Sequence, residues 1–311
     1  MKVKAVVLGS LNADLVAEVP RTPYEGESLL AGRFSVLPGG KGANQACTLS
    51  RLGAEVTMLG AVGQDGYARL LRDSLRQAGV DDSRLDDRAD APTGVAMIAV
   101  CPNGSNSIIS VLGANSRLDC AYIDRNLDLL RSCDVLVLQL EIPPEVAAYA
   151  AQKAKGLGKL VVLDPAPVPP SLPEGLLQAA DLVKPNEVEL GLLTGIPEAE
   201  QRLEEAVARL KGLGAKNVLV TLGGQGCCVA QPDGSLLHIP AKKVRAVDTT
   251  AAGDAFTAAT AIRLAEGDSL PQAAAFATEV AAIVVTRKGA QASIPTREEL
   301  EQLRPHPAWN G

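Results

Sequence analysis

The feature that most constrains the fold is a regular alternation of short apolar runs with longer amphipathic stretches. Each apolar run has the length of a strand buried on both faces, and each amphipathic stretch has helical spacing. Strand, helix and strand repeated in this way predict a three-layer, doubly wound α/β fold, with a mostly parallel sheet between two helical layers. The expected strands are residues 5–8, 56–59, 135–140, 160–163 and 218–222, and the expected helices are residues 42–52, 65–78, 145–157 and 255–265.

Two segments, residues 13–37 and 93–112, interrupt this alternation. In the second, apolar residues 95–101 and 107–112 flank a Pro-Asn-Gly turn, which predicts a β-hairpin. Neither segment is long enough to fold alone. We therefore expect a single domain over residues 1–311, with the two segments forming a small β-sheet that serves as a lid or a dimerisation surface.

Charge and composition exclude several classes of protein. The 311 residues carry a net charge of −6 that is spread along the chain, which disfavours nucleic-acid binding. No apolar run approaches the roughly 20 residues of a membrane helix, and residues 1–9 are too short and strand-like for a signal peptide. The six cysteines show no C-x-x-C spacing and there are two histidines, so reduced thiols are expected rather than a zinc site. These observations predict a soluble cytoplasmic protein.

The densest chemical signal is the stretch of small residues at 248–254, just before a helix-compatible run. Backbone N–H groups at a helix start, with the helix dipole, form an anion site, and Gly253 lets a phosphate approach closely. Asp254 would then be placed to accept the proton of a hydroxyl that attacks phosphorus. The alternative is that Asp254 only caps the helix.

Polar residues also follow two of the expected strands. Asn12 and Asp14 follow the first strand and Glu141 follows a later one, at the sheet edge where ligands bind in open α/β folds. An Asn and an Asp together can bind a vicinal diol, although surface turns contain the same residues. The glycine turn at 38–46 opens a helix, but it is not a P-loop, because Gly42 follows Lys41. An ordinary strand-to-helix turn is the alternative for this segment.

Two further motifs are compatible with a nucleotide. Asn186 and Glu189 share a helix face and could order water on Mg²⁺ or touch phosphate, although helix capping produces the same pattern. The turn at 221–226 leaves room for a nucleotide. It does not match the dinucleotide fingerprint G-x-G-x-x-G, because Val229 stands three residues after Gly226.

Taken together and in this order, the motifs resemble those of the ribokinase-like carbohydrate kinases, from about Val6 to Pro295. The resemblance implies ATP-dependent transfer of phosphate to the 5-hydroxyl of D-ribose, by an α/β domain whose β lid pairs in a homodimer. A sibling kinase acting on deoxyribose, another sugar or a nucleoside would share these motifs. A nicotinamide oxidoreductase would share the α/β alternation, but the chain lacks its fingerprint. A catalytically inactive sugar sensor would share the fold, but it predicts loss of Asp254.

The resemblance also implies roles for individual residues. Asp254 would be the general base, and Ala251, Ala252 and Gly253 would form the anion hole. Ala255, Ala258 and Thr278 depart from residues common in the family. The sugar would be held by Asn12, Asp14, Gly40, Lys41, Asn44, Glu141 and Asp254. The nucleotide would be bound by Asn186, Thr221, Leu222, Gly223, Gly224, Gln225, Gly226, Gly253, Asp254 and Thr278.

Two cations are implied as well. Asn186 and Glu189 would order the water shell of Mg²⁺. The second cation is potassium, and the alternative to a potassium site is that Asp248 simply pairs with Arg287 or Lys288. Potassium would lie among Asp248, Thr250, Val284, Arg287, Gly289 and Ser293.

Overall fold

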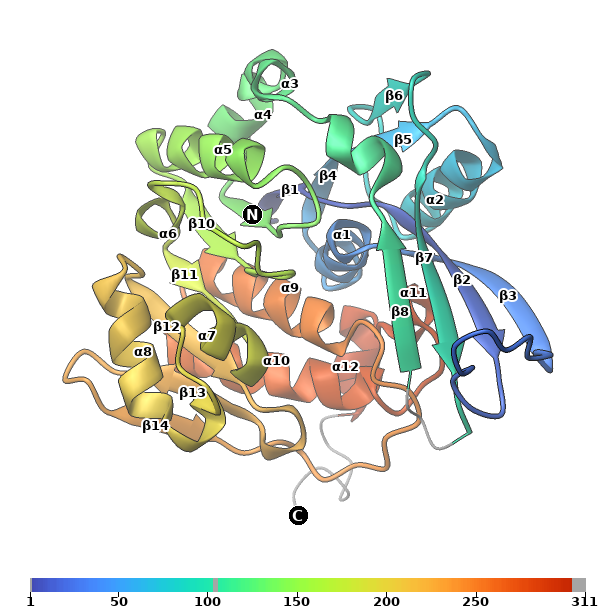
Figure 1. The fold of residues 1–311 in the computed structure, drawn as a ribbon. Helices are drawn as coiled ribbons and strands as arrows, with labels where there is room; N and C mark the ends of the chain where they lie inside the picture. The colour runs from blue at the N-terminus through green and yellow to red at the C-terminus, as the bar shows by residue number, and fades with distance from the viewer. Residues whose placement is uncertain (1, 103–105, 304–311) are drawn as a thin grey trace.

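The computed structural model describes residues 2–102 and 106–303, and its centre is an eight-stranded sheet between two layers of helices (Figure 1). The strand order is β14-β13-β12-β11-β10-β9-β1-β4, parallel from β4 to β12 and antiparallel at β13 and β14. The strands are β1 (Lys4–Leu8), β4 (Glu55–Leu59), β9 (Val135–Leu138), β10 (Leu160–Leu163), β11 (Leu182–Val183), β12 (Asn217–Thr221), β13 (Cys227–Ala230) and β14 (Leu236–Ile239).

Each face of this sheet is covered by its own helices. Neighbouring residues of β1 enter separate hydrophobic clusters, Val7 on one face and Val6 on the other, which is why the strands are apolar without alternation. The predicted doubly wound α/β class is thereby confirmed. One layer contains α1 (Lys41–Arg51), α2 (Gly66–Gln77), α9 (Ala252–Ala265), α10 (Leu270–Val284), α11 (Ala290–Ser293) and α12 (Arg297–Leu303). The other contains α3 (Cys120–Arg125), α4 (Leu127–Ser132), α5 (Pro144–Gly156), α6 (Leu176–Ala179), α7 (Glu187–Thr194) and α8 (Leu203–Gly212).

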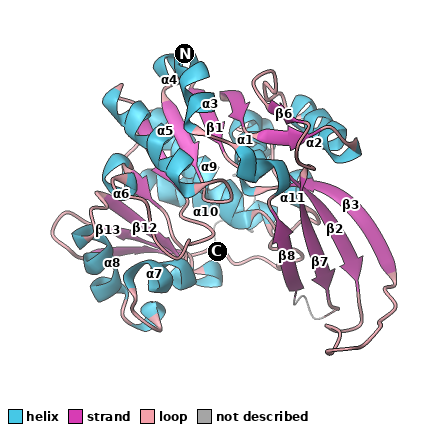
Figure 2. Cartoon of the chain, turned by 45° about the horizontal axis from the view of Figure 1, so that its top comes forward, coloured by secondary structure: helices cyan, strands magenta, loops and turns pink. Residues whose placement is uncertain are grey.

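A separate four-stranded sheet lies to one side of the central sheet (Figure 2). It arises from the two segments that interrupt the α/β alternation, and its order is β3-β2-β7-β8. The antiparallel pairing of β7 with β8 agrees with the predicted hairpin, whose turn at 103–105 falls outside the described residues. The strands are β2 (Asn12–Glu18), β3 (Arg33–Gly39), β7 (Gly94–Val100) and β8 (Asn106–Val111); β5 (Ala61–Gly63) and β6 (Asp86–Arg88) form a further parallel pair.

The ends of some elements differ from the sequence prediction. Strand β9 ends at Leu138 rather than at residue 140, since the amide of Leu140 already donates to the carbonyl of Ala166 in the loop after β10. Helix α9 begins at Ala252, three residues before the predicted start. Both differences lie at the carboxyl edge of the sheet, where the chain leaves regular structure to form loops.

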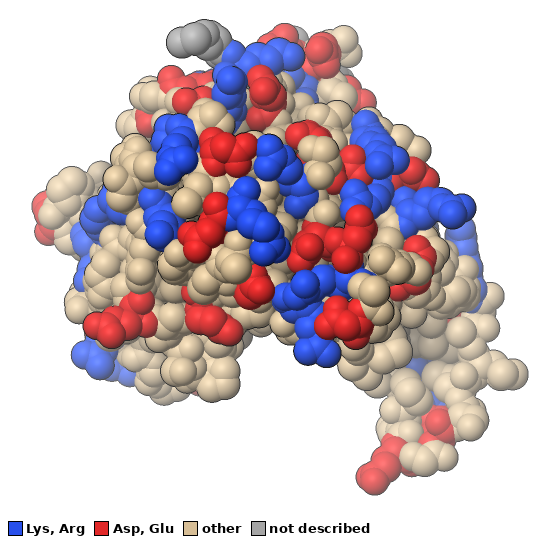
Figure 3. Space-filling view, turned by 90° about the horizontal axis from the view of Figure 1, so that it is seen from above, with Lys and Arg blue, Asp and Glu red and all other residues tan. Residues whose placement is uncertain are grey.

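On the face shown in Figure 3, basic and acidic side chains are interspersed and no field of one sign dominates. None of the helices in residues 2–102 and 106–303 is both long and apolar enough to cross a membrane.

Candidate active site

The first polar group of the site is built where β1 passes into β2. Asn12 and Asp14 are the first and third residues of β2 and both are buried. Asn12 donates from Nδ2 to Glu141 Oε2 (3.3 Å), and the Ser10 hydroxyl donates to the same oxygen (2.5 Å). Asn115 Nδ2 donates to Asn12 Oδ1 (2.9 Å), which fixes the amide orientation. The structure thus brings Asn12 and Glu141, which the family resemblance assigns to one sugar site, into direct contact.

The glycine turn places helix α1 against this group. Gly40 has φ +91°, and a Cβ on it would lie 2.6 Å from the amide nitrogen of Asn12 and 2.8 Å from the carbonyl oxygen of Ser10. Only glycine allows this conformation and this close approach. The turn therefore carries Lys41 and Asn44, on the first turn of α1, to the edge of the sheet beside Asn12.

Asp254, on the first turn of α9, lies next to α1. Its Oδ2 accepts a hydrogen bond from Asn44 Nδ2 (2.8 Å), and Gln291 Nε2 donates to Asn44 Oδ1 (3.2 Å) and so orients the amide. The N-cap of α9 is Ala251, and no side chain caps this helix. The Asp254 carboxylate is therefore turned toward the residues assigned to the sugar, which argues against a capping role.

The backbone before Asp254 has an unusual conformation. Ala251 is in the left-handed region at φ +63°, which costs energy for a residue with a Cβ and is frequent at functional sites. The Ala252 amide donates to the carbonyl of Thr249 (3.2 Å), so this amide must turn away from Thr249 to reach a phosphate. The segment predicted to form the anion hole is thus a strained turn at the start of a helix.

The charges of the site influence one another. Burial raises the pKa of Asp254. The Lys41 ammonium and the hydrogen bond from Asn44 act in the opposite direction and lower this pKa in part. Burial, together with the nearby carboxylates of Glu141 and Asp254, raises the pKa of Asp14 to about 7. Burial alone would lower the pKa of Lys41, but the surrounding carboxylates, first that of Asp254, hold it above its usual value. Lys41 is therefore a cation that favours the ionised form of the acidic cluster.

A cavity of about 900 Å³ adjoins the start of α9. Of the residues predicted to bind nucleotide, those with an atom on its wall are Asn186, Thr221, Gly223, Gly224, Gly226, Gly253 and Thr278. Leu222, Gln225 and Asp254 are not among its lining residues. The Leu222 side chain packs against the hydrophobic cluster on the other side of the sheet, and the carbonyl of Gln225 bonds the His238 ring (2.8 Å).

Asn186 and Glu189 form a reciprocal capping box at the start of α7. The side chain of Asn186 accepts from the Glu189 amide, and the side chain of Glu189 accepts from the Asn186 amide (both 2.8 Å). Helix capping is therefore what this pair does in the structure. A carboxylate has about four acceptor positions, so Glu189 retains capacity to bind the water shell of a magnesium ion.

Several of the residues assigned to potassium also lie together. Asp248 accepts from the amide and hydroxyl of Thr250 (2.9 and 2.7 Å) and from the Gly289 amide (2.9 Å), which joins the two segments concerned. Arg287 pairs with Glu299 (3.1 Å) rather than with Asp248. The Lys288 ammonium, the other partner of that alternative, acts on Asp248 and helps to lower its pKa. Ser293 donates to the carbonyl of Ala290 (2.7 Å). Among the described residues no three His, Cys, Asp or Glu side chains gather as a metal cluster.

Comparison with known proteins identifies the family of this chain. The model of the pfkB family carbohydrate kinases matches residues 2–297. The chain belongs to the pfkB family. This chain is 38% identical to the ribokinase of Haemophilus influenzae over 307 residues, which cover 98% of this chain and 100% of the Haemophilus protein. It is 37% identical to the deoxyribokinase of Salmonella typhi over 297 residues, with 95% and 97% covered.

Comparison with solved structures leads to the same family. The structure of Arabidopsis thaliana ribokinase complexed with ribose and ATP superposes with a TM-score of 0.89 at 35% identity, over 98% of this chain and 100% of that chain. The family and the kinase activity predicted from sequence are thereby confirmed.

Sequence reasoning missed part of the wall of the 900 Å³ cavity. The loop between β14 and α9 contributes Lys242, Lys243 and Arg245 to its wall, and Phe256 and Val285 add apolar surface. The signal for the loop was present as three basic residues within four positions, in a chain whose charges are otherwise mixed. The apolar residues gave no signal, because they are indistinguishable from core positions of α9 and α10.

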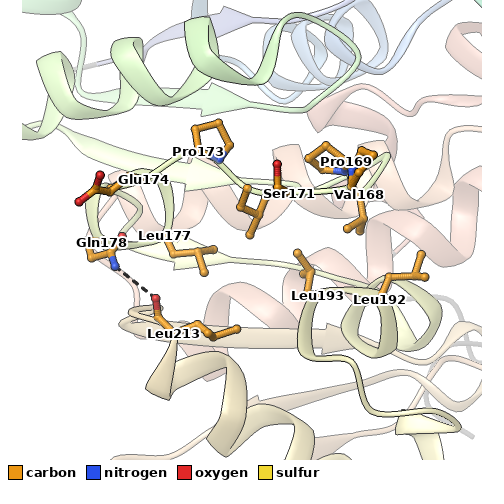
Figure 4. A pocket seen from close by; sticks show the side chains of 13 residues that line it. Val168, Pro169, Ser171, Pro173, Glu174, Leu177, Gln178, Leu192, Leu193 and Leu213 are labelled. Carbon is orange, nitrogen blue, oxygen red and sulfur yellow. Dashed lines mark hydrogen bonds between the residues drawn. The ribbon is translucent and has the colours of Figure 1, made fainter.

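A second hollow of about 370 Å³ lies below the Pro-rich loop that follows β10 (Figure 4). Its labelled side chains are mostly aliphatic, including Val168, Leu177, Leu192 and Leu193, and the hydrogen bond drawn joins Gln178 to the carbonyl of Leu213 (3.2 Å). Among the described residues that line it, Glu174 is the one charged residue.

Proposed function

We propose that this kinase transfers the γ-phosphoryl group of ATP to the 5-hydroxyl of D-ribose, giving D-ribose 5-phosphate. One observation carries the proposal. Asp254 accepts a hydrogen bond from Asn44 on the sugar side, while its neighbours Ala252 and Gly253 line the nucleotide cavity. A hydroxyl bound beside Asp254 would thus face the end of a triphosphate bound in that cavity.

In this mechanism Asp254 accepts the proton of the attacking hydroxyl, a role worth roughly 10²–10⁴ in rate. The proton acceptor must be ionised, and Lys41 favours the ionised form although burial opposes it. Asn12, Asp14 and Glu141 bind the other hydroxyls and so fix which hydroxyl reaches the base. The amides of Ala251, Ala252 and Gly253 stabilise the charge of the phosphoryl group in transfer.

We also propose magnesium and potassium as cofactors. Asn186 and Glu189 would hold magnesium through water, and the 248–250 and 284–293 segments would hold potassium. Burial alone would raise the pKa of Asp248, but hydrogen bonds from Thr250 and Gly289 lower it, which provides an ionised oxygen ligand. Bound magnesium would neutralise negative charge on the ATP phosphates. Bound potassium would place a positive charge where residues 248–250 meet residues 284–293, next to the anion hole.

The four-stranded sheet is proposed to act as a lid and to join two copies of the chain. Its strand register aligns Ile109, Met97, Leu15 and Val36 in one row across all four strands. That row lies on the face opposite Asp14, since successive residues of a strand alternate in direction. Ile109 is 62% exposed and Met97 43%. A symmetric partner presenting the same row would bury this apolar face.

The cytoplasm is the proposed compartment. ATP is used there, and all six cysteines are free thiols, as expected in a reducing environment.

The test is ATP consumption with a panel of D-ribose, 2-deoxy-D-ribose, D-fructose and adenosine, with product position read by NMR. We expect the highest kcat/KM for ribose and phosphate on the 5-oxygen. Higher kcat/KM for deoxyribose would favour a deoxyribokinase instead, since the identity to the Salmonella typhi enzyme is similar. Turnover of none of the four would contradict the proposal.

A further inference from the structure

A buried ion pair between Lys184 and Asp164 lies next to Gly253 of the predicted anion hole. Neither residue belongs to the predicted sugar, nucleotide or cation sites. Asp164 follows β10 and Lys184 follows β11, two neighbouring parallel strands, so both side chains emerge at the carboxyl edge of the sheet. Lys184 Nζ lies 3.3 Å from Asp164 Oδ2, and the side chains are 4% and 2% exposed. Burying two charges is expensive, so such a pair requires an explanation.

The two carboxylate oxygens of Asp164 have unequal sets of partners. Asp164 Oδ2 accepts from Gln45 Nε2 (3.1 Å) and Lys184, and it lies 3.1 Å from Thr257 Oγ1, whose single proton also has the Gly253 carbonyl oxygen within reach (2.9 Å). Oδ1 is buried with no hydrogen-bond partner among the described residues. Among the described residues, the carboxylate thus makes its bonds through the oxygen that faces the lysine.

Lys184 reaches from this pair to Gly253, at the start of α9. Its Nζ is 3.5 Å from the carbonyl oxygen of Gly253, at the limit of a hydrogen bond. A Cβ on Gly253 would lie 3.8 Å from Nζ, and no other heavy atom outside its own helix and chain neighbours comes within 4 Å of that point. The space that Gly253 leaves open for a phosphate is thus bordered by the ammonium group. An ammonium carries three protons, and Asp164 and Gly253 account for two.

We propose that Lys184 is a catalytic residue that donates its remaining proton, as a hydrogen bond, to an oxygen of the phosphoryl group in transfer, and that Asp164 is its positioning residue. This inference rests on the proposed kinase reaction. The lysine keeps its proton throughout, so the overall transfer to Asp254 is unchanged. Lys184 would add a positive charge where negative charge accumulates in the transition state, on the side opposite the solvent.

The decisive experiment uses three variants. Lys184→Met removes the ammonium and keeps the side-chain length, but it leaves Asp164 buried without its cation. The double variant Asp164→Asn, Lys184→Met removes both charges and should fold as the wild type does. Lys155→Met is the matched control, because Lys155 pairs with Asp181 at the other end of β11.

We expect kcat to fall about 10²–10³-fold in both Lys184 variants, the loss typical for removal of one transition-state donor. The KM for sugar and the Kd for MgADP should stay within about two-fold, because neither contains the phosphoryl group in transfer. Lys155→Met should keep wild-type kcat. A double variant within about three-fold of wild-type kcat would overturn the inference and leave the pair a structural one.

A second measurement separates this inference from the kinase assignment. Aluminium fluoride with MgADP mimics the phosphoryl group, and its binding can be followed by calorimetry without turnover. We expect the gain in affinity that aluminium fluoride gives the wild type to be lost in the double variant. An equal gain in both proteins would overturn the role of Lys184, whereas an inactive wild type would overturn only the assigned substrate.

Discussion

Ribose affinity should rise with pH through neutrality because of Asp14. Burial, Glu141 and Asp254 raise the pKa of this carboxyl to about 7. Only the ionised form accepts two hydroxyl protons, whereas the protonated form loses one acceptor position. With a pKa near 7, about one-tenth of the molecules are ionised at pH 6 and about nine-tenths at pH 8. The Kd for ribose should therefore fall roughly ten-fold from pH 6 to pH 8 and change little above pH 8.

Isothermal titration calorimetry in two buffers of different ionisation enthalpy measures both quantities that matter. At pH 6 ribose binding should release close to one proton, and at pH 8 it should release almost none. Asp14→Asn should weaken binding and abolish the pH dependence. Asp254→Asn should move the midpoint of the pH dependence below 7, since it removes one of the carboxylates that raise the pKa of Asp14. A ribose Kd independent of pH, or an unchanged slope in Asp14→Asn, would refute this reasoning.

Three other results are expected. Asp254→Asn should lower kcat by roughly 10²–10⁴ while sugar and ATP binding stay within a few-fold; a variant with more than about a tenth of wild-type kcat would show that Asp254 is not the base. In tetramethylammonium buffer, potassium should activate the kinase and sodium less so, and equal rates with potassium, sodium or neither would exclude the ion site. Ile109→Glu should convert a dimer into a monomer in sedimentation velocity, whereas Ile108→Glu, 55% exposed on the opposite face of the same strand, should not; dissociation by both or neither would contradict the apolar row as the interface.

The fold and the polar groups at the strand ends were predictable from sequence. Parallel strands bring their carboxyl ends to one edge, so Asn12 and Glu141 were expected to be near each other although they are far apart in the chain. Their hydrogen bond agrees with that expectation. The position of Asp254 beside Asn44 was implied by family resemblance and not by any local pattern.

Other features could not be predicted because they depend on packing. Leu222 belongs to the same turn as glycines that line the cavity, yet its half-buried side chain packs against the hydrophobic cluster on the other face of the sheet. Lys184 and Asp164 are 20 residues apart and meet because β10 and β11 are neighbours. A periodic pattern indicates which residues are buried in strands, but not which charged residues beyond the strand ends face each other.

Strand β2 has a further consequence for the rate at which ribose leaves. All of it belongs to the four-stranded sheet, and it begins with Asn12 and Asp14 of the proposed sugar site and continues without a break to Glu18. Glu141, by contrast, follows β9 of the central sheet. A tilt of the four-stranded sheet would therefore move Asp14 relative to Glu141. Ribose release and sheet opening would then be the same event, and the dissociation rate constant of ribose would report how often the sheet opens.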